Sequence, residues 1–401
     1  MPKPLNVALI GSKFMGRTHS NAYMKVGKFF DLPRQPVMHT IAARDEADLK
    51  QFAPRWGWNQ YTTRWQDVCE SDEIELIDIG VPNHMHREMA VAALEAGKHV
   101  ACEKPLANTL DNAREMVEAA KKAGKRAKKQ QTFVWYNYRR TPAVALAHQF
   151  ARSGMLGKLY HVRCFYLQDW AGPDAPMLWR FQGDVAGSGS LGDLCAHSID
   201  TARFITGDEI SEINGAILKT FVKERAVLAG GAGGEISGGG AKTAKKKAKS
   251  TVDDAVLFTA EFKEGAVATF EATRLSTGDK NGNRIEVHGE KGAIKFDFEH
   301  MTKLEWYDNT LPARQQGWST IDVSNGGAGH PYGDVWWPTA HPIGYEHTFI
   351  NQAADMVKAL AGRKPEVPLC DFNDAYQTQR VLEAVTQSAK NRCPIKLSQI
   401  K

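Results

Sequence analysis

The sequence predicts an α/β protein, with a doubly wound parallel sheet in its N-terminal part and an α+β part with a large, mostly antiparallel sheet after it. Two observations lead to this fold class. Residues 1–131 alternate short apolar runs with helical patterns, which indicates parallel strands joined by right-handed crossovers. From residue 132 onward, strand-like runs follow one another across tight turns, which is typical of antiparallel pairing. We therefore expect two domains, 1–131 and 132–401.

Four apolar runs of the first domain are expected to form parallel strands. They are LNVALI (5–10), VMHTIAA (37–43), ELIDIG (75–80) and KHVACE (98–103). Two of the helical patterns, REMAVAALEAG and LDNAREMVEAAKKAG, end in glycine as a helix C-cap does. Ligands of such sheets bind at the carboxyl ends of the strands, so the segments that follow the strands should border a ligand crevice. These segments are GSKFMG (11–16), VPNHMH (81–86) and EKP (103–105).

The second domain contains six further strand-like runs and two terminal helical patterns. The runs are LYHVRCFYLQDW, INGAILKTFV, AVLFTAEF, AVATFEATR, RIEVHG and GAIKFDF, and the helices are expected at 344–362 and 373–390. The Gly-rich segment 229–241 cannot pack a core, and the Lys-rich run 242–250 follows it directly. We expect 229–250 to form one flexible, solvated loop.

Composition indicates an ordinary soluble globular protein. The chain has 401 residues, a net charge of +5, 42% hydrophobic residues and no apolar run of membrane-spanning length, so we expect no membrane association. Its six cysteines are scattered and form no C-x-x-C pair, which argues against disulfides and structural zinc and favours the cytoplasm. The basic runs 121–129 and 242–250 lack interleaved aromatic residues, so we expect solvated surfaces and no nucleic-acid partner.

The N-terminus has the order strand, Gly-rich turn, helix that a Rossmann-type dinucleotide site requires. The turn offers backbone N–H groups, and the helix N-terminus adds partial positive charge for a pyrophosphate. Lys13 replaces the second glycine of the usual fingerprint, so its ammonium group is expected to assist at the phosphates. The alternative is a tight turn with a purely structural role. The expected cofactor-binding residues are Gly11, Lys13, Phe14, Met15, Gly16, Ala43, Arg44, Pro82, Asn83, His86, Glu103 and Lys104.

The choice between NAD and NADP stays open in the sequence. An acidic residue at the end of the second strand would bind the ribose 2′-hydroxyl of NAD, but Ala43 and Arg44 occupy that position. Arginine accommodates the 2′-phosphate of NADP. Alternatively, Arg44 points to solvent or stacks on the adenine while Asp45 reaches the ribose.

Lys104, Asp193 and His197 are the candidate catalytic residues. Lys104 stands at a strand end and is fixed by the following proline. Asp193, His197 and Asp200 have the spacing i, i+4, i+7, which predicts that they share one face of a helix. A lysine with an Asp/His pair can move a proton on and off an alcohol. The alternatives are an ion-paired surface lysine, a core histidine, a helix-anchoring Asp200 or a metal site, and we favour catalysis over all of them.

The combination of EKP after a Rossmann-type strand with the helix motif G-D-x-x-x-H-x-x-D resembles the glucose–fructose oxidoreductase, inositol dehydrogenase and MocA (Gfo/Idh/MocA) family, along the whole chain. Further segments, among them NYRRTPAVALA, YLQDW, WRF, AGSGSLGD and HPYG, are similar to the levoglucosan dehydrogenase-like sugar dehydrogenases of that family. The resemblance implies a cis Lys104–Pro105 bond, oxidation at C3 of a pyranose with a nicotinamide cofactor, and a homo-oligomer, dimer or tetramer, paired through the open sheet face of the second domain.

We therefore expect an NAD(P)-dependent dehydrogenase that acts on a secondary CH–OH group of a sugar or sugar-like polyol. The expected substrate-binding residues are Lys104, Asn137, Gln168, Trp170, Arg180, Asp193 and His197. Indole faces stack on sugar rings, and amide and guanidinium groups bind hydroxyls. Two alternatives remain at this point: an NAD-dependent glycoside-cleaving enzyme that works by transient oxidation and elimination, and a non-enzymatic regulator that senses dinucleotides.

Overall fold

The computed structural model describes residues 3–126, 129–229 and 243–401. The chain forms two compact units. The first comprises the chain up to Arg140 together with Gly344–Tyr376, and the second comprises Thr141–Ile343 with Gln377–Lys401. The sequence placed 132–401 in one domain, whereas residues 344–376 pack with the first unit.

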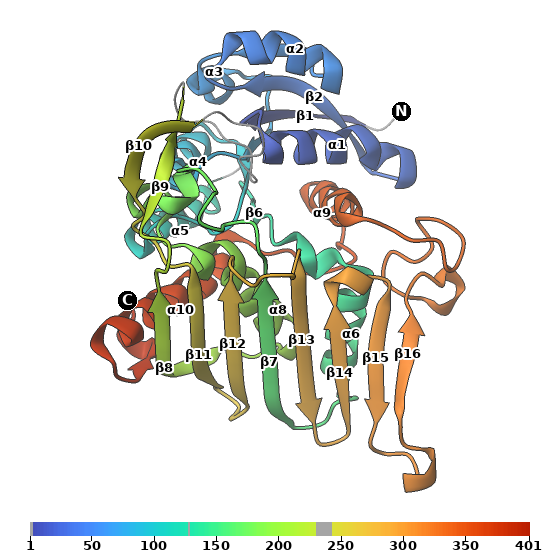
Figure 1. Ribbon diagram of the computed structural model, residues 1–401. Helices are drawn as coiled ribbons and strands as arrows, with labels where there is room; N and C mark the ends of the chain where they lie inside the picture. Colours follow the sequence, from blue (N-terminus) through green and yellow to red (C-terminus); the bar gives the residue numbers. More distant parts are fainter. Residues whose placement is uncertain (1–2, 127–128, 230–242) are drawn as a thin grey trace. The chain divides into compact units, whose positions relative to one another are not determined.

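The first unit is built on a six-stranded, entirely parallel sheet in the order β3-β2-β1-β4-β5-β6. Figure 1 labels its strands β1, β2 and β6. Its strands are β1 (Lys3–Ile10), β2 (Arg34–Ala42), β3 (Gln60–Thr62), β4 (Leu76–Ile79), β5 (His99–Cys102) and β6 (Thr132–Val134). The interior strands β4 and β5 are buried along their whole length, as mostly apolar strands between two helical layers should be. This confirms the predicted doubly wound sheet, and β3 and β6 are the strands that the pattern missed, because each has only three residues.

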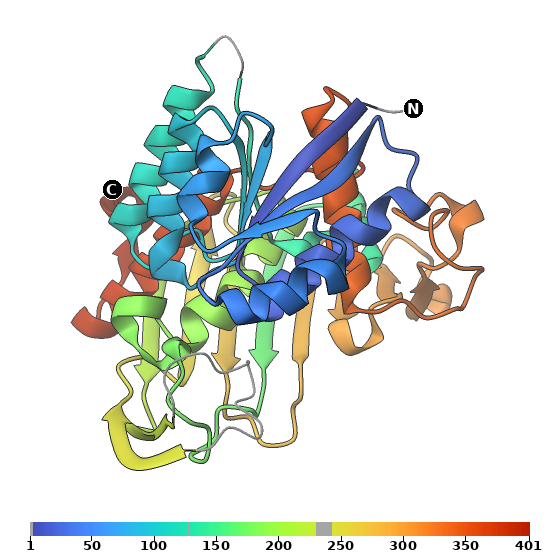
Figure 2. The same ribbon diagram turned by 90° about the horizontal axis from the view of Figure 1, so that it is seen from above.

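Helices cover both faces of this sheet. They are α1 (Phe14–Phe29), α2 (Glu46–Trp56), α3 (Trp65–Glu70), α4 (His86–Glu95), α5 (Leu110–Ala123) and α9 (Tyr345–Leu360). Helices α1 and α9 pack on each other on one face, and α4 and α5 pack on each other on the opposite face (Figure 2). The stripe of α1 that faces inward includes Gly16, His19, Ser20, Tyr23 and Val26, at the spacing of one helix face.

The second unit is built on a nine-stranded mixed sheet in the order β16-β15-β14-β13-β7-β12-β11-β8-β17. All neighbours are antiparallel except β12 and β7, which are parallel. The strands are β7 (Leu159–Leu167), β8 (Ile210–Lys219), β11 (Ala255–Phe262), β12 (Val267–Thr273), β13 (Gly282–Gly289), β14 (Gly292–Asp297), β15 (Lys303–Asp308), β16 (Trp318–Asp322) and β17 (Ile395–Lys396). This confirms the predicted large, mostly antiparallel sheet.

One face of the large sheet carries α6 (Pro142–Arg152) and α8 (Ala196–Thr206), which pack on each other and on β7 and β13–β15. Along β11 and β12 buried and exposed residues alternate, so the other face is open among the described residues (Figure 1). The short helix α7 (Gly183–Ala186) precedes α8, and α10 (Phe372–Asn391) passes from the first unit into the second.

The expectation of one loop over 229–250 is wrong for its described part. Residues 243–249 form strand β10 (Thr243–Lys249), which pairs antiparallel with β9 (Glu224–Leu228). Ala248 packs against an apolar cluster around Phe181, so the lysine-rich run has one anchored position between solvated charges. Residues 230–242 lie outside the described part of the chain. Within the described residues, no helix combines the length and the hydropathy needed to cross a membrane.

Candidate active site

The turn after β1 accepts only glycine at its two ends. Gly11 has φ +115°, and a Cβ atom there would lie 2.4 Å from the Gly80 carbonyl oxygen. A Cβ at Gly16 would lie 2.2 Å from the Gly11 carbonyl oxygen. Lys13 is the N-cap residue of α1, and its side chain makes no capping hydrogen bond. Because no N-cap side chain occupies them, the first N–H groups of α1 can bind a ligand. Phe14, Met15 and Gly16 form the first turn of α1. These residues fit a dinucleotide pyrophosphate.

Lys13 and Arg44 lie at the edge of this turn. The Lys13 Nζ lies 3.1 Å from Asp48 Oδ2, and the Ser12 hydroxyl donates to the same oxygen at 2.5 Å. Partial burial raises the pKa of Asp48, but the hydrogen bonds from Ser12 and Lys13 outweigh burial and lower it. Lys13 therefore ties the turn to α2. Ala43 follows β2, Arg44 is exposed, and the Asp45 carboxylate accepts the Asp48 N–H as the N-cap of α2.

The loop after β4 contains Pro82 and Asn83 and leads into α4. Asn83 opens a short 3-10 turn, η1 (Asn83–Met85). His86 is fully buried: its Nδ1 lies 3.1 Å from the Pro105 carbonyl oxygen and its Nε2 lies 2.9 Å from the Val81 carbonyl oxygen. Burial lowers the pKa of His86. This ring joins the loops that follow β4 and β5, and its contact with a cofactor stays a prediction.

Lys104 follows β5 in the Glu103–Pro105 loop, and the Lys104–Pro105 peptide bond is cis. The buried Glu103 carboxylate accepts the Lys104 N–H at 3.0 Å and lies 3.0 Å from His19 Nε2. Glu103 thus fixes the backbone from which the Lys104 side chain extends. His19 Nδ1 lies 3.0 Å from Asp78 Oδ2, so one imidazole ring bridges two carboxylates.

His19 is a residue that the sequence analysis missed. Burial lowers its pKa, but the charges and hydrogen bonds of Asp78 and Glu103 outweigh burial and raise it from 6.5 to about 9. The imidazolium ring stacks on Trp135 at 4.3 Å between centroids, and Asp78 also accepts hydrogen bonds from Tyr23 and Trp135. The sequence feature that could have identified it is a histidine on the otherwise buried face of α1.

In the second unit, Asp193 and His197 come from a helical segment with a change of winding. Residues Leu191–Cys195 form a π-helical turn, η4, and α8 begins at Ala196. The expected stack of Asp193, His197 and Asp200 on one α-helical face is therefore wrong for Asp193, because a π-turn is wider than an α-turn. Asp193 is partly exposed, whereas His197 and Asp200 are buried. Such π-turns are frequent at functional sites.

A chain of polar and aromatic contacts leads from His197 to the segment after β7. The Tyr166 ring lies 6.1 Å from the His197 ring, and its hydroxyl donates to Asn281 Oδ1 at 2.8 Å. The Gln168 amide donates to the same oxygen at 2.7 Å, and Trp170 Nε1 donates to Gln168 Oε1 at 2.7 Å. The structure thus brings together three predicted residues, Gln168, Trp170 and His197, through two that were missed.

Arg274 joins Asp193 to this set. Its Nη1 lies 3.4 Å from Asp193 Oδ2, and its guanidinium group lies 5.4 Å from the Trp170 ring centroid. Arg274 follows the alternating buried positions 268, 270 and 272 of β12. An arginine at the next buried position of this strand pattern was the sequence feature that could have identified it.

The other predicted substrate-binding residues lie in different settings. Arg180 stacks on the neighbouring Trp179 ring at 4.4 Å and is partly exposed. Asn137 belongs to the first unit, is 2% exposed and donates to Thr348 Oγ1 at 2.8 Å. Its amide attaches the 137–140 turn to α9, and a sugar contact of Asn137 stays a prediction.

Known proteins share both units of this chain. The family described as "Oxidoreductase family, NAD-binding Rossmann fold" matches residues 5–130, and the family described as "GFO/IDH/MocA C-terminal domain" matches residues 144–295. The levoglucosan dehydrogenase of Pseudarthrobacter phenanthrenivorans is 40% identical over an alignment of 401 residues that covers 99% of each chain. The chain belongs to the Gfo/Idh/MocA family. The resemblance seen in the motifs is thereby confirmed.

Solved structures agree with this family membership. The oxidoreductase domain protein from Kribbella flavida superimposes with a TM-score of 0.90 at 43% identity, covering 98% of this chain and 99% of that one. Levoglucosan dehydrogenase in complex with NADH and levoglucosan superimposes with a TM-score of 0.88 at 37% identity, with the same coverage. The protein is an NAD-binding oxidoreductase, as expected, and the residues around Gly11 and Gly16 fit that cofactor.

Proposed function

We propose that the protein oxidises a secondary hydroxyl of a carbohydrate with NAD, and that C3 of a pyranose such as levoglucosan is the position attacked. The observation that carries this proposal is the cluster of the second unit, in which Asp193 and His197 accompany an indole face and two amides. Alternating apolar faces and hydrogen-bonding groups suit a sugar ring. The relatives that oxidise or reduce sugars, including levoglucosan dehydrogenase, support the same substrate class.

Each side chain has a distinct proposed role. Bound NAD supplies the hydride acceptor. The His197 imidazole removes the proton of the reacting hydroxyl as a general base. The Lys104 ammonium donates a hydrogen bond to the same oxygen and stabilises the negative charge that develops on it. Asp193, held by Arg274, accepts a hydrogen bond from a neighbouring hydroxyl.

Binding of the sugar is proposed to fall on the segment after β7. Trp170 offers a ring face to the apolar C–H surface of a pyranose, and Gln168 and Arg180 offer polar groups to its hydroxyls. Glu103 acts at one remove, through the backbone of Lys104. We also propose that the protein forms a homodimer or homotetramer. We propose a cytoplasmic location as well, because all six cysteines are free, as is typical of proteins in a reducing compartment.

The test is a screen of anhydrosugars, free pyranoses, glycosides and inositols, with NADH formation followed by absorbance. Lys104→Ala and His197→Ala should each lower kcat by about a hundredfold or more while NADH affinity, measured by fluorescence titration, is retained. Lys158→Ala and His161→Ala, which change the same residue types outside the site, are the controls. Near-normal turnover of both Lys104→Ala and His197→Ala would refute the assignment. Cleavage of a glycoside without accumulation of NADH would replace it by the elimination reaction.

A further inference from the structure

Two adjacent buried carboxylates, Asp253 and Asp254, lie immediately before β11. Their carboxylates accept hydrogen bonds from different segments of the chain. Asp253 accepts hydrogen bonds from the Gly189 N–H at 2.7 Å, the Ser190 hydroxyl at 2.6 Å and the Leu191 N–H at 2.9 Å. Asp253 therefore holds the start of the π-turn that carries Asp193.

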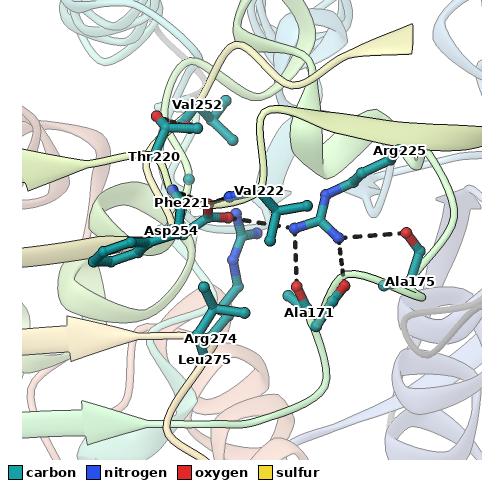
Figure 3. A network of polar contacts seen from close by, with 12 residues as sticks. Ala171, Ala175, Thr220, Phe221, Val222, Arg225, Val252, Asp254, Arg274 and Leu275 are labelled. Carbon is teal, nitrogen blue, oxygen red and sulfur yellow. Dashed lines mark hydrogen bonds and ion pairs between the residues drawn. The ribbon is translucent and has the colours of Figure 1, made fainter. Parts of the chain in front are cut away.

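Asp254 serves the segment that follows β7, through Arg225 (Figure 3). Asp254 Oδ2 accepts the N–H groups of Phe221 and Val222, and its Oδ1 lies 3.4 Å from Arg225 Nη2. The Arg225 guanidinium donates to three carbonyl oxygens of that segment: those of Ala171 at 2.9 Å, Gly172 at 2.7 Å and Ala175 at 3.3 Å. The buried Arg225 side chain thus provides hydrogen bonds to the backbone of this irregular segment.

Phe181 lies between the two buried arginines of this region. The Arg225 guanidinium carbon lies 3.7 Å from the Phe181 ring centroid, and that of Arg274 lies 5.1 Å from it. Arg274 also contacts Trp170 and Asp193, and its Nη2 donates to the Asp253 carbonyl oxygen at 3.4 Å. One connected group of side chains therefore reaches both the sugar-binding segment and the segment that carries Asp193.

Packing alone does not account for these charges. Burial lowers the pKa of Arg225 to about 10, which still leaves it protonated at neutral pH. Buried charged groups seldom add stability over apolar residues of similar size, but their directional bonds fix geometry.

We propose that Asp253, Asp254, Arg225 and Arg274 form a positioning unit that sets the Gln168–Arg180 segment relative to Asp193. The proposal rests on the sugar-oxidising function proposed above and identifies four positioning residues for it. None of them needs to touch the sugar. Their effect is on where Trp170, Gln168 and the Asp193 carboxylate stand when the sugar binds.

Arg225→Lys and Arg274→Lys test the proposal, because lysine keeps the charge but cannot donate in a planar fork to several acceptors. We expect each to raise the sugar KM by about tenfold to a hundredfold, since small misplacements of binding groups have effects of this size. NADH affinity should stay within about twofold, because the cofactor residues lie in the other unit. A merely structural role would lower the amount of folded enzyme, and therefore the apparent kcat, without changing KM.

Arg203→Lys is the matched control. Arg203 is also a buried arginine of the second unit, but it pairs with Glu209 and Thr378. Its replacement should leave the sugar KM unchanged. If Arg225→Lys does not fold, Asp254→Asn decides in its place, because the asparagine keeps an oxygen for Phe221 and Val222 and removes the charge that faces Arg225.

Three outcomes separate the possibilities. Raised sugar KM in the test variants and normal KM in Arg203→Lys support the proposal. Unchanged sugar KM in Arg274→Lys together with Arg225→Lys or Asp254→Asn overturns it, while the sugar-oxidising function stands. A wild-type protein that oxidises no sugar overturns the function and this inference together.

Discussion

Replacing His19 by glutamine removes the cation that lies between Asp78 and Glu103 in the first unit. Both carboxylates are buried, and the imidazole nitrogens lie 3.0 Å from an oxygen of each. Glutamine can still donate one hydrogen bond, but it leaves two like charges without a counterion. The cost at acidic to neutral pH should be on the order of 3–5 kcal/mol of unfolding free energy, as for other buried pairs that lose one partner.

The pH dependence gives a sharper test than the size of the loss. The pKa of His19 is raised from 6.5 to about 9 in the folded protein, and at about 1.4 kcal/mol per pKa unit this corresponds to about 3.5 kcal/mol of stability. Because the folded pKa is the higher one, this stabilisation is fully present below 6.5 and is lost as pH rises through about 9. The difference between wild type and His19→Gln should therefore shrink as the solution becomes alkaline.

Urea unfolding followed by circular dichroism, at about pH 6 and about pH 10, measures this difference. Groups that titrate identically in both proteins cancel. The double variant His19→Gln/Asp78→Asn should lose less than the sum of the single losses, because removal of one carboxylate relieves the repulsion. A wild-type advantage of equal size at both pH values would refute the view that His19 is an imidazolium ion in the folded protein.

Two further predictions concern the cofactor. Gly16→Ala should weaken NADH binding by about tenfold or more, because its Cβ would lie 2.2 Å from the Gly11 carbonyl oxygen and would displace the turn. The control is Gly124→Ala, whose Cβ would make only ordinary contacts and which should bind NADH normally. Near-normal affinity of Gly16→Ala in a fluorescence titration would contradict this prediction. Arg44→Asp should weaken NADPH binding by about tenfold and leave NADH binding within about threefold, because a carboxylate repels the 2′-phosphate. Equal loss of both cofactors would show that Arg44 does not read the 2′-position.

The sequence predicted the parts of the fold that depend on local pattern. Continuous apolar runs identified β4 and β5, and period-two alternation identified β11 and β12, because burial of one or both sheet faces dictates those patterns. The pairing of β10 with β9 was missed, since four lysines hide a strand whose anchor is Ala248. The return of 344–376 to the first unit depends on long-range packing, which no local pattern encodes.

The candidate site could be predicted only where a functional residue stands in a short, recognisable sequence motif. Motifs predicted Lys104 and His197 as candidates, but the π-turn at Leu191–Cys195 changes the register that an α-helix would give Asp193. His19 and Arg274 were missed because their roles come from partners distant in sequence, such as Glu103 and Asp193. In both cases the local sequence shows only an ionisable residue at a position where the pattern of the helix or strand predicts burial.

The route of the chain has a practical consequence for anyone who divides this enzyme. A fragment that stops after β6 would lack α9, and Phe14 and His19 of α1 would lose their ring contacts with Tyr345 and Phe349 of α9. The crossing at Tyr376–Gln377 falls inside the continuous helix α10, so a cut there would leave each piece with a helix stump. A self-standing nucleotide-binding fragment would have to be spliced from two stretches, with a short artificial connection from Arg140 to Gly344.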